Sequence, residues 1–294
     1  MPNLRFAGVL TATTTPFTSD GSVDLVRFRE HCEWQLGEGV LGVVPCGSLG
    51  EYESLTDAER QAVVIAAVDA VGSSGLVIPG VSGKSAGERV RWAEQAKQAG
   101  CAAVMCLPPT SHAPTDDEVV AHFTAVAAVG LPVIVYNNPF STRVDLTPPL
   151  LARLAQVNGI VAVKEFSQDV RRFAHISQLA PSLELLVGCD DLLAEGVLMG
   201  ATGWIAGYSN ALPNLCVRLF DLCREERWGE ALPLYRAMLP ALRWDAMPSF
   251  VQAIKLGQDE AGRYGGPVRL PRLPLREADE AEARKDVRAA MAAT

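Results

Sequence analysis

A lysine and a tyrosine stand at the ends of two consecutive apolar runs, where they could do covalent chemistry together. Lys164 closes the run that begins at Val161, and Tyr136 closes the run that begins at Pro132. A lysine at the carboxyl end of a buried strand sits in a dry pocket that disfavours its ammonium form, so its neutral amine can attack a carbonyl carbon. The phenol of Tyr136 can then move protons on the imine that forms. The alternative for Lys164, taken alone, is a solvated residue that begins a loop.

Eight short apolar runs alternate with stretches of helical period along the first two thirds of the chain. These runs are rich in valine and isoleucine, and they lie at about 7–12, 41–45, 76–80, 102–107, 132–136, 160–164, 184–188 and 203–206. Strands that alternate with helices indicate βαβ units and a parallel sheet. Eight such units favour a closed (β/α)8 barrel of the α/β class over an open doubly wound sheet.

After the eighth run the pattern changes to helices alone. These helices are predicted at about 211–227, 230–242, 249–260 and 279–291. A proline-rich stretch from Pro267 to Pro274 links the last two of them. We therefore place the barrel in residues 1–208 and a C-terminal helical subdomain in residues 209–294.

Local signals mark where several helices begin and end. Thr56, with Glu59 three residues later, predicts a capping box, and Gly72 predicts the end of the same helix. A similar signal opens a helix at Asp190. Asp190 and its neighbour Asp191 are therefore better explained as helix N-caps than as catalysts.

The composition argues against several classes of protein. The chain has 294 residues, 49% hydrophobic and 20% charged, which is typical of a packed globular enzyme. A formal net charge of −8 and the lack of a Lys/Arg-rich run argue against a nucleic-acid partner. The seven cysteines form no CxxC pair, so we expect reduced thiols and a cytoplasmic protein. The apolar run of only five residues near the N-terminus is too short for a signal-peptide core, and no segment reaches the ~18 uninterrupted apolar residues of a membrane span.

A glycine-rich turn follows the second apolar run and reads GSLGE over residues 47–51. Its two glycines allow a tight turn whose backbone N–H groups point inward and can bind a carboxylate oxygen. Ser48 adds a hydroxyl beside these groups. Because the carboxyl ends of barrel strands meet on one face, we expect this turn to lie near Tyr136 and Lys164. A turn without a function is the alternative.

Taken together, the GSLGE turn, the sequence YNNP that begins at Tyr136, and Lys164 resemble the motifs of the dihydrodipicolinate synthase and N-acetylneuraminate lyase superfamily of class I aldolases. The resemblance covers nearly the whole chain, from the segment 8–17 to the helical tail. It implies a (β/α)8 barrel with C-terminal helices, commonly a homotetramer, and we expect a homo-oligomer here, either a tetramer or a dimer. It also implies a pyruvate-like 2-oxo acid as substrate.

The resemblance also assigns roles to single residues. Three residues match catalytic positions of the superfamily. Lys164 matches the lysine that forms the imine, Tyr136 matches the tyrosine that transfers protons, and Ser48 matches the hydroxyl residue that relays the phenol proton. Four residues match positions that bind substrate or line the pocket, and these are Gly47, Leu49, Gly188 and Ile205.

Three positions depart from the dihydrodipicolinate synthases of this superfamily. Those enzymes carry Thr-Thr in the turn, where this chain has Ser48 and Leu49, so an apolar group replaces a donor to the substrate carboxylate. Ser141 stands where they place an arginine that helps to bind the carboxylate of the second substrate. Their second relay tyrosine, lent by a neighbouring subunit, is missing, because the matching segment 108–112 reads PPTSH, with threonine at position 110.

These departures favour another branch of the superfamily. The GSLGE turn, YNNP followed by Val144-Asp145-Leu146, Lys164 followed by Asp169-Val170-Arg171-Arg172, and Asp190-Asp191 form a combination of motifs. This combination resembles the 1-pyrroline-4-hydroxy-2-carboxylate deaminases and the dehydratases and aldolases of 2-keto-3-deoxy sugar acids. In such reactions an enzyme-bound imine acts as an electron sink, so that a β group leaves or a carbon–carbon bond breaks. We therefore expect a Schiff-base lyase that acts on a small 2-oxo acid or cyclic imino acid. A 4-hydroxy-tetrahydrodipicolinate synthase and a catalytically inactive relative that binds a keto acid are the alternatives.

His112 is a candidate for the missing proton carrier, because it lies in the loop that should supply the relay group. An ordinary loop residue is the alternative. The four histidines, at positions 31, 112, 122 and 175, show no metal-ligand spacing, and we expect neither a metal nor a cofactor. The expected partner is a small molecule, with no membrane or nucleic acid involved.

Overall fold

The computed structural model describes residues 4–293 and contains eight parallel strands. They are β1 Val9–Ala12, β2 Gly42–Val44, β3 Leu76–Val77, β4 Val104–Cys106, β5 Val133–Asn137, β6 Ile160–Glu165, β7 Glu184–Val187 and β8 Gly203–Ala206. Each strand falls within or close to one of the eight predicted apolar runs. The runs are buried on both faces, as expected of strands that have side chains packed inside a barrel and helices outside it.

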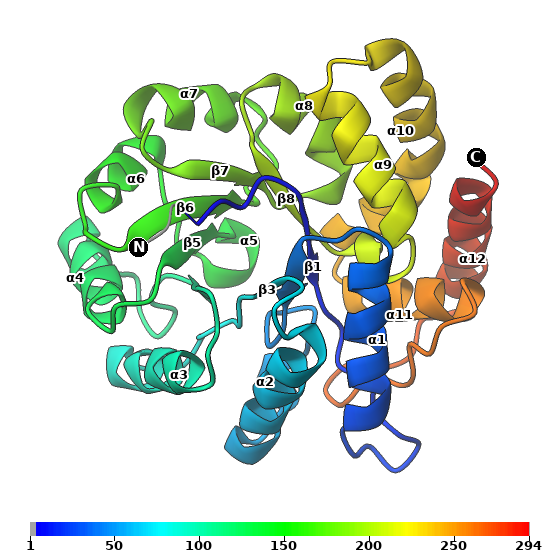
Figure 1. Cartoon of the computed structure of the whole chain (residues 1–294), viewed down its shortest axis with the longest axis horizontal. Helices are drawn as coiled ribbons and strands as arrows, with labels where there is room; N and C mark the ends of the chain where they lie inside the picture. The colour runs from blue at the N-terminus through cyan, green and yellow to red at the C-terminus, as the bar shows by residue number, and fades with distance from the viewer. Residues whose placement is uncertain (1–3, 294) are drawn as a thin grey trace.

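The strands form one curled sheet in the order β3-β2-β1-β8-β7-β6-β5-β4. A parallel bridge between Gly80 and Met105 joins the two ends of this order, and the Met105 backbone N–H donates to Pro79 O at 3.0 Å. These contacts close the sheet, so the predicted (β/α)8 barrel is confirmed as an α/β barrel with helices around its outside (Figure 1).

Twelve α-helices lie within the described residues. They are α1 Leu25–Gly37, α2 Asp57–Val71, α3 Ala86–Gln98, α4 Asp116–Ala127, α5 Pro139–Thr142, α6 Pro148–Leu154, α7 Arg171–Leu179, α8 Leu193–Leu198, α9 Pro213–Arg224, α10 Trp228–Leu242, α11 Phe250–Glu260 and α12 Glu277–Met291. Four 3-10 helices complete the set: η1 Tyr52–Ser54, η2 Asp190–Leu192, η3 Tyr208–Asn210 and η4 Arg243–Ala246. None of the helices in this part of the chain is long and apolar enough to cross a membrane.

The predicted capping box is confirmed. The Thr56 hydroxyl accepts a hydrogen bond from the Glu59 backbone N–H, the Glu59 carboxylate accepts one from the Thr56 N–H, and Gly72 ends α2. The N-cap prediction for Asp190 is wrong. Cys189 occupies that position without a side-chain hydrogen bond, because the Asp190 carboxylate turns toward the residues that follow β8.

The C-terminal helices lie beside the barrel, at the right of Figure 1. All four predicted helices are found, as α9 to α12. The division at residues 208 and 209 stays a prediction, and α9 contacts β1 and α8 as the helix of an eighth βα unit would.

A buried ion pair joins these helices to the barrel. Lys255 Nζ of α11 lies 2.8 Å from Glu51 Oε1, and both side chains are 2% exposed. The other carboxylate oxygen of Glu51 accepts a hydrogen bond from the Arg269 backbone N–H at 3.1 Å. Arg269 in turn binds the Glu59 carboxylate of α2 and holds the pKa of that group at about 2. The segment from Lys255 to Arg269 is thus tied to the turn that follows β2.

Replacing Lys255 with alanine is expected to lower the free energy of unfolding by about 3–5 kcal/mol, because the change leaves Glu51 as a buried charge without its partner. Denaturant titration of the variant and the wild type measures the difference. The control is Lys285→Ala, which removes an exposed lysine of α12 and should change stability by less than about 0.5 kcal/mol. Equal stability of Lys255→Ala and the wild type would show that this pair does not hold α11 to the barrel.

Candidate active site

A cavity of about 830 Å³ opens where the carboxyl ends of the strands meet. Five of the seven residues predicted for the site line it, and these are Gly47, Ser48, Leu49, Tyr136 and Lys164. They come from the turn after β2 and from the ends of β5 and β6. The position of the cavity is the one at which barrel enzymes place their catalytic groups.

Tyr136 and Lys164 are direct neighbours in the sheet. They are register partners on β5 and β6, and Lys164 Nζ lies 4.5 Å from the centre of the Tyr136 ring. The ring of Phe166 lies 5.9 Å from the same nitrogen. Gly188, at the end of β7, leaves room for the lysine, because a Cβ there would lie 3.1 Å from Lys164 Cε. The amine therefore has an aromatic and largely apolar surrounding.

Burial lowers the pKa of Lys164, although the carboxyls of Asp245 and, with a smaller effect, Asp190 oppose the shift. The lysine side chain thus carries a neutral amine more readily than an exposed lysine does, as imine formation requires. Burial also raises the pKa of Tyr136 well above its usual range, so its phenol keeps its proton. Asn138 Nδ2 donates a hydrogen bond to the Tyr136 hydroxyl oxygen at 3.1 Å and fixes its direction.

The GSLGE turn is held tightly against the segment that follows β1. A Cβ on Gly50 would lie 3.0 Å from Thr13 O, and the Thr15 hydroxyl donates to Gly50 O at 2.8 Å, so a larger residue at position 50 does not fit. Leu49 is 4% exposed and presents an apolar side chain to the cavity. The glutamate of the motif, Glu51, has a left-handed backbone with φ of 53°, lines the cavity and pairs with Lys255.

Two predicted positions do not line the cavity. Gly188 lies beneath the Lys164 side chain, and Ile205 is fully buried on β8, where it pairs with Leu10 of β1. Their roles, like the relay role of Ser48, stay predictions.

Two acidic residues of the site were missed by sequence reasoning or assigned otherwise. Asp190 is fully buried and accepts hydrogen bonds from Trp204 Nε1 at 2.9 Å, from the Gly207 N–H at 3.1 Å and from the Tyr208 N–H at 2.7 Å. Asp245 of η4 lines the cavity together with Lys164. Asp245 lies in the C-terminal helices, so no strand-end pattern could have pointed to it.

The residues at the three departures lie at the cavity, whereas the candidate proton carrier His112 does not line it. Leu49, Thr110 and Ser141 all line the cavity. His112 is exposed, with Nε2 3.7 Å from a Glu118 carboxylate oxygen, and it is not among the residues that line the cavity of its own chain. Its role as a substitute proton carrier stays a prediction.

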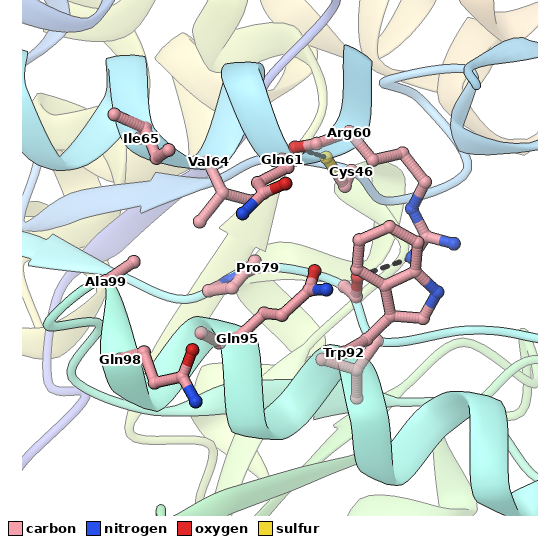
Figure 2. Close-up of a pocket in the computed structure, with 13 residues that line it drawn as sticks. Cys46, Arg60, Gln61, Val64, Ile65, Pro79, Trp92, Gln95, Gln98 and Ala99 are labelled. Carbon is pink, nitrogen blue, oxygen red and sulfur yellow. Dashed lines mark hydrogen bonds between the residues drawn. The ribbon is translucent and has the colours of Figure 1, made fainter. Parts of the chain in front are cut away.

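A second cavity, of about 200 Å³, lies outside the barrel between α2 and α3 (Figure 2). Arg60 of α2 stacks over the ring of Trp92 of α3 at 4.0 Å and donates hydrogen bonds to Ser82 O and Gly80 O. These contacts anchor α2 to the loop after β3. None of the predicted site residues lines this cavity, so we assign the chemistry to the first one.

Comparison with known proteins agrees with this geometry. Residues 5–290 match the Dihydrodipicolinate synthetase family. The chain belongs to this family. A relative from Anaeromyxobacter dehalogenans (strain 2CP-C), a 4-hydroxy-tetrahydrodipicolinate synthase, is 33% identical over 284 residues, which cover 96% of this chain and 96% of the relative.

Solved structures of the dihydrodipicolinate synthetase family have the same fold. The 4-hydroxy-tetrahydrodipicolinate synthase from the methanotroph Methylacidiphilum fumariolicum SolV matches with a TM-score of 0.94 at 25% identity, over 98% of this chain and 97% of that chain. The dihydrodipicolinate synthase from Aquifex aeolicus matches with a TM-score of 0.92 at 26% identity, over 96% and 97%. This chain is therefore an enzyme, a class I lyase or aldolase of the dihydrodipicolinate synthetase family.

Proposed function

We propose that this enzyme binds a small 2-oxo acid of the pyruvate type as an imine on Lys164. The observation that carries this proposal is the pairing of Tyr136 with a buried Lys164 whose pKa is lowered. The neutral amine attacks the keto carbon, and Tyr136 gives a proton to the carbonyl oxygen and takes one from the nitrogen. The backbone N–H groups of the GSLGE turn would bind the substrate carboxylate.

For the step after imine formation we propose elimination or cleavage of the bound substrate. Suitable substrates are 1-pyrroline-4-hydroxy-2-carboxylate and 2-keto-3-deoxy acids. The iminium withdraws electrons, so the adjacent carbon loses a proton and the β group leaves, or the adjacent carbon–carbon bond breaks. The support comes from Leu49, Thr110 and Ser141, which line the cavity and give it no phenol and no guanidinium at these positions.

Condensation of pyruvate with aspartate semialdehyde is the second candidate, and the comparisons favour it over elimination. The relative described above is a 4-hydroxy-tetrahydrodipicolinate synthase that aligns over 96% of its own length. Arg269 and Arg272 line the cavity and could receive a second carboxylate in place of the arginine that Ser141 replaces.

A cytoplasmic location and assembly as a dimer or tetramer remain part of the proposal.

Side-by-side kinetics with one preparation of the enzyme decide between the two candidates. We expect kcat/KM for elimination or deamination of at least one substrate, either a keto-deoxy acid or 1-pyrroline-4-hydroxy-2-carboxylate, to exceed kcat/KM for the condensation by about 100-fold, or about 2.7 kcal/mol in barrier. The physical reason is that condensation must also bind and protonate a second substrate. A panel in which condensation is the fastest reaction would reject elimination and establish the second candidate.

A further inference from the structure

Arg272 places a positive charge at the wall of the active-site cavity. It is half-buried and lies in the segment between α11 and α12. Its Cζ lies 5.0 Å from the centre of the Phe250 ring, and its Nη1 donates a long hydrogen bond of 3.5 Å to Pro248 O. Phe250 and Pro248 line the cavity themselves. The guanidinium, and not only the stem of the side chain, therefore lies at the cavity wall.

The other arginine that lines the cavity, Arg269, has no donor left for a ligand. Its guanidinium donates to Gly21 O, to Ser54 O and to both carboxylate oxygens of Glu59. These five hydrogen bonds use all five N–H groups that a guanidinium has. Within residues 4–293 the guanidinium of Arg272 makes only the long bond to Pro248 O, so four of its N–H groups have no acceptor in the described chain.

The carboxylates around the cavity do not neutralise Arg272. Three acidic side chains line the cavity, and these are Glu51, Glu53 and Asp245. Glu51 pairs with Lys255, and Glu53 accepts a hydrogen bond from the Tyr52 hydroxyl at 3.1 Å. In the part of the chain that the structure describes, no carboxylate lies within salt-bridge distance of Arg272. Its charge is therefore available to an anion in the cavity.

The backbone that carries Arg272 is held in place. Pro271 and Pro274 restrict its conformation, and the Arg272 N–H donates to Arg269 O at 3.0 Å. Gln252 Nε2 of α11 donates to the carbonyl oxygen of the next residue, Leu273, at 2.9 Å. A ligand that binds here does not have to order this segment first, which lowers the entropic cost of binding.

From these observations we infer that Arg272 selects a substrate that is acidic at both ends. The 2-oxo acid carries a second carboxylate at the end opposite its keto group, and this carboxylate forms a bidentate pair with the guanidinium. The carboxylate beside the keto carbon stays with the backbone N–H groups of the GSLGE turn. The inference rests on the proposed function, because it takes Lys164 as the lysine that forms the imine. It narrows the keto-deoxy acids to dicarboxylic ones.

The size and the composition of the cavity agree with such a substrate. A volume of about 830 Å³ lies in the range of sites that enclose ligands much larger than a three-carbon acid. Ser141 leaves the segment after β5 without a guanidinium, and Arg272 brings one to the same cavity from the C-terminal part of the chain. A carboxylate partner is thus provided at a different place in the fold.

The test compares 2-oxo acids of equal chain length that end in a carboxylate or in a methyl group. The diacids are 2-oxoglutarate, 2-oxoadipate and 2-oxopimelate, and the monoacids are 2-oxopentanoate, 2-oxohexanoate and 2-oxoheptanoate. The full-length enzyme is labelled with each acid and borohydride, and the initial rate of labelling of Lys164 against acid concentration gives an apparent dissociation constant. We expect at least one diacid to bind about 10- to 100-fold more tightly than its monoacid, the scale for hydrogen bonds to a charged group.

Three variants assign this preference to the guanidinium. Arg272→Gln should abolish the preference and leave the constant for pyruvate within about twofold of the wild-type value. Arg272→Lys should keep part of the preference, because it retains the charge but not the bidentate geometry. The matched control is Arg276→Gln, which removes an exposed arginine of the same region that does not line the cavity, and it should keep the full preference.

The possible failures can be told apart. If the wild type gains no adduct on Lys164 with pyruvate, the proposed function fails and this inference fails with it. If the wild type is labelled but prefers no diacid, or if Arg272→Gln keeps the preference, the inference alone is overturned.

Two further outcomes would also overturn it. In the first, Arg272→Gln leaves every constant for a 2-oxo acid unchanged but raises KM for aspartate semialdehyde, so that Arg272 serves the second substrate of a condensation. The second concerns the wild type alone and decides the matter if Arg272→Gln does not fold. The preference for a diacid should then decrease as salt is added, because salt screens a half-buried ion pair, and a preference that salt does not change excludes Arg272 as its source.

Discussion

Lys164→Ala is expected to gain no covalent adduct with pyruvate and borohydride, whereas the wild type should gain one that peptide mapping places on Lys164. Without the amine no imine forms, so nothing accepts the electrons that remain on the substrate when a bond next to the imine carbon breaks. Turnover of any substrate should fall by a factor on the order of 10⁵ or more, the scale for loss of a catalytic nucleophile.

The control for this experiment is Lys84→Ala, which removes an exposed lysine in the loop after β3. It should be labelled and should turn over as the wild type does. An adduct that survives in Lys164→Ala would place the imine on another lysine, and the geometry described for β5 and β6 would then serve some other purpose.

Tyr136→Phe is expected to keep the fold and to lose between about 10² and 10⁴ in kcat, the range for removal of a general acid–base group. The ring still packs beside Lys164, so the amine keeps its apolar surrounding and its lowered pKa. Only the hydroxyl that Asn138 holds is missing. Steady-state kinetics measure the loss of kcat, and thermal unfolding of the same preparation shows whether the fold is kept.

Tyr264→Phe is the matched control, because the hydroxyl of Tyr264 donates to Phe17 O and does not line the cavity. It should retain nearly full activity. Turnover of Tyr136→Phe near that of the wild type would move proton transfer to another group, with Asp245 as the first to examine.

The barrel and the central pair of the site could be predicted because their signals are local. Each strand is a short apolar run, and parallel topology brings the ends of all strands to one face whatever their exact register. Tyr136 and Lys164 close two neighbouring runs, so their contact followed from chain order alone. The structure adds that they are direct register partners.

The remaining residues of the site depend on packing that no local pattern records. Asp245 reaches the cavity because η4 packs against η2 and against Gly207, which follows β8, and it lies about 80 residues after Lys164 in the chain. Asp190 carries the same sequence signal as an N-cap, but its carboxylate instead accepts hydrogen bonds from the indole N–H of Trp204 on β8 and from the backbone N–H groups of Gly207 and Tyr208 after β8. In both cases the position of the carboxyl is set by contacts with residues far away in the sequence, which local helix signals do not record.

The link between Glu51 and the C-terminal helices has a consequence for how this protein is made. Glu51, in the turn that carries Ser48 and Leu49, is paired by Lys255 and by the backbone of Arg269, which are synthesised about 200 residues later. A ribosome that has released the eight strands has therefore produced Lys164 and Tyr136 but not the two groups that pair with Glu51. Until Lys255 and Arg269 have been synthesised, the Glu51 carboxylate at the future catalytic face therefore lacks both of these partners.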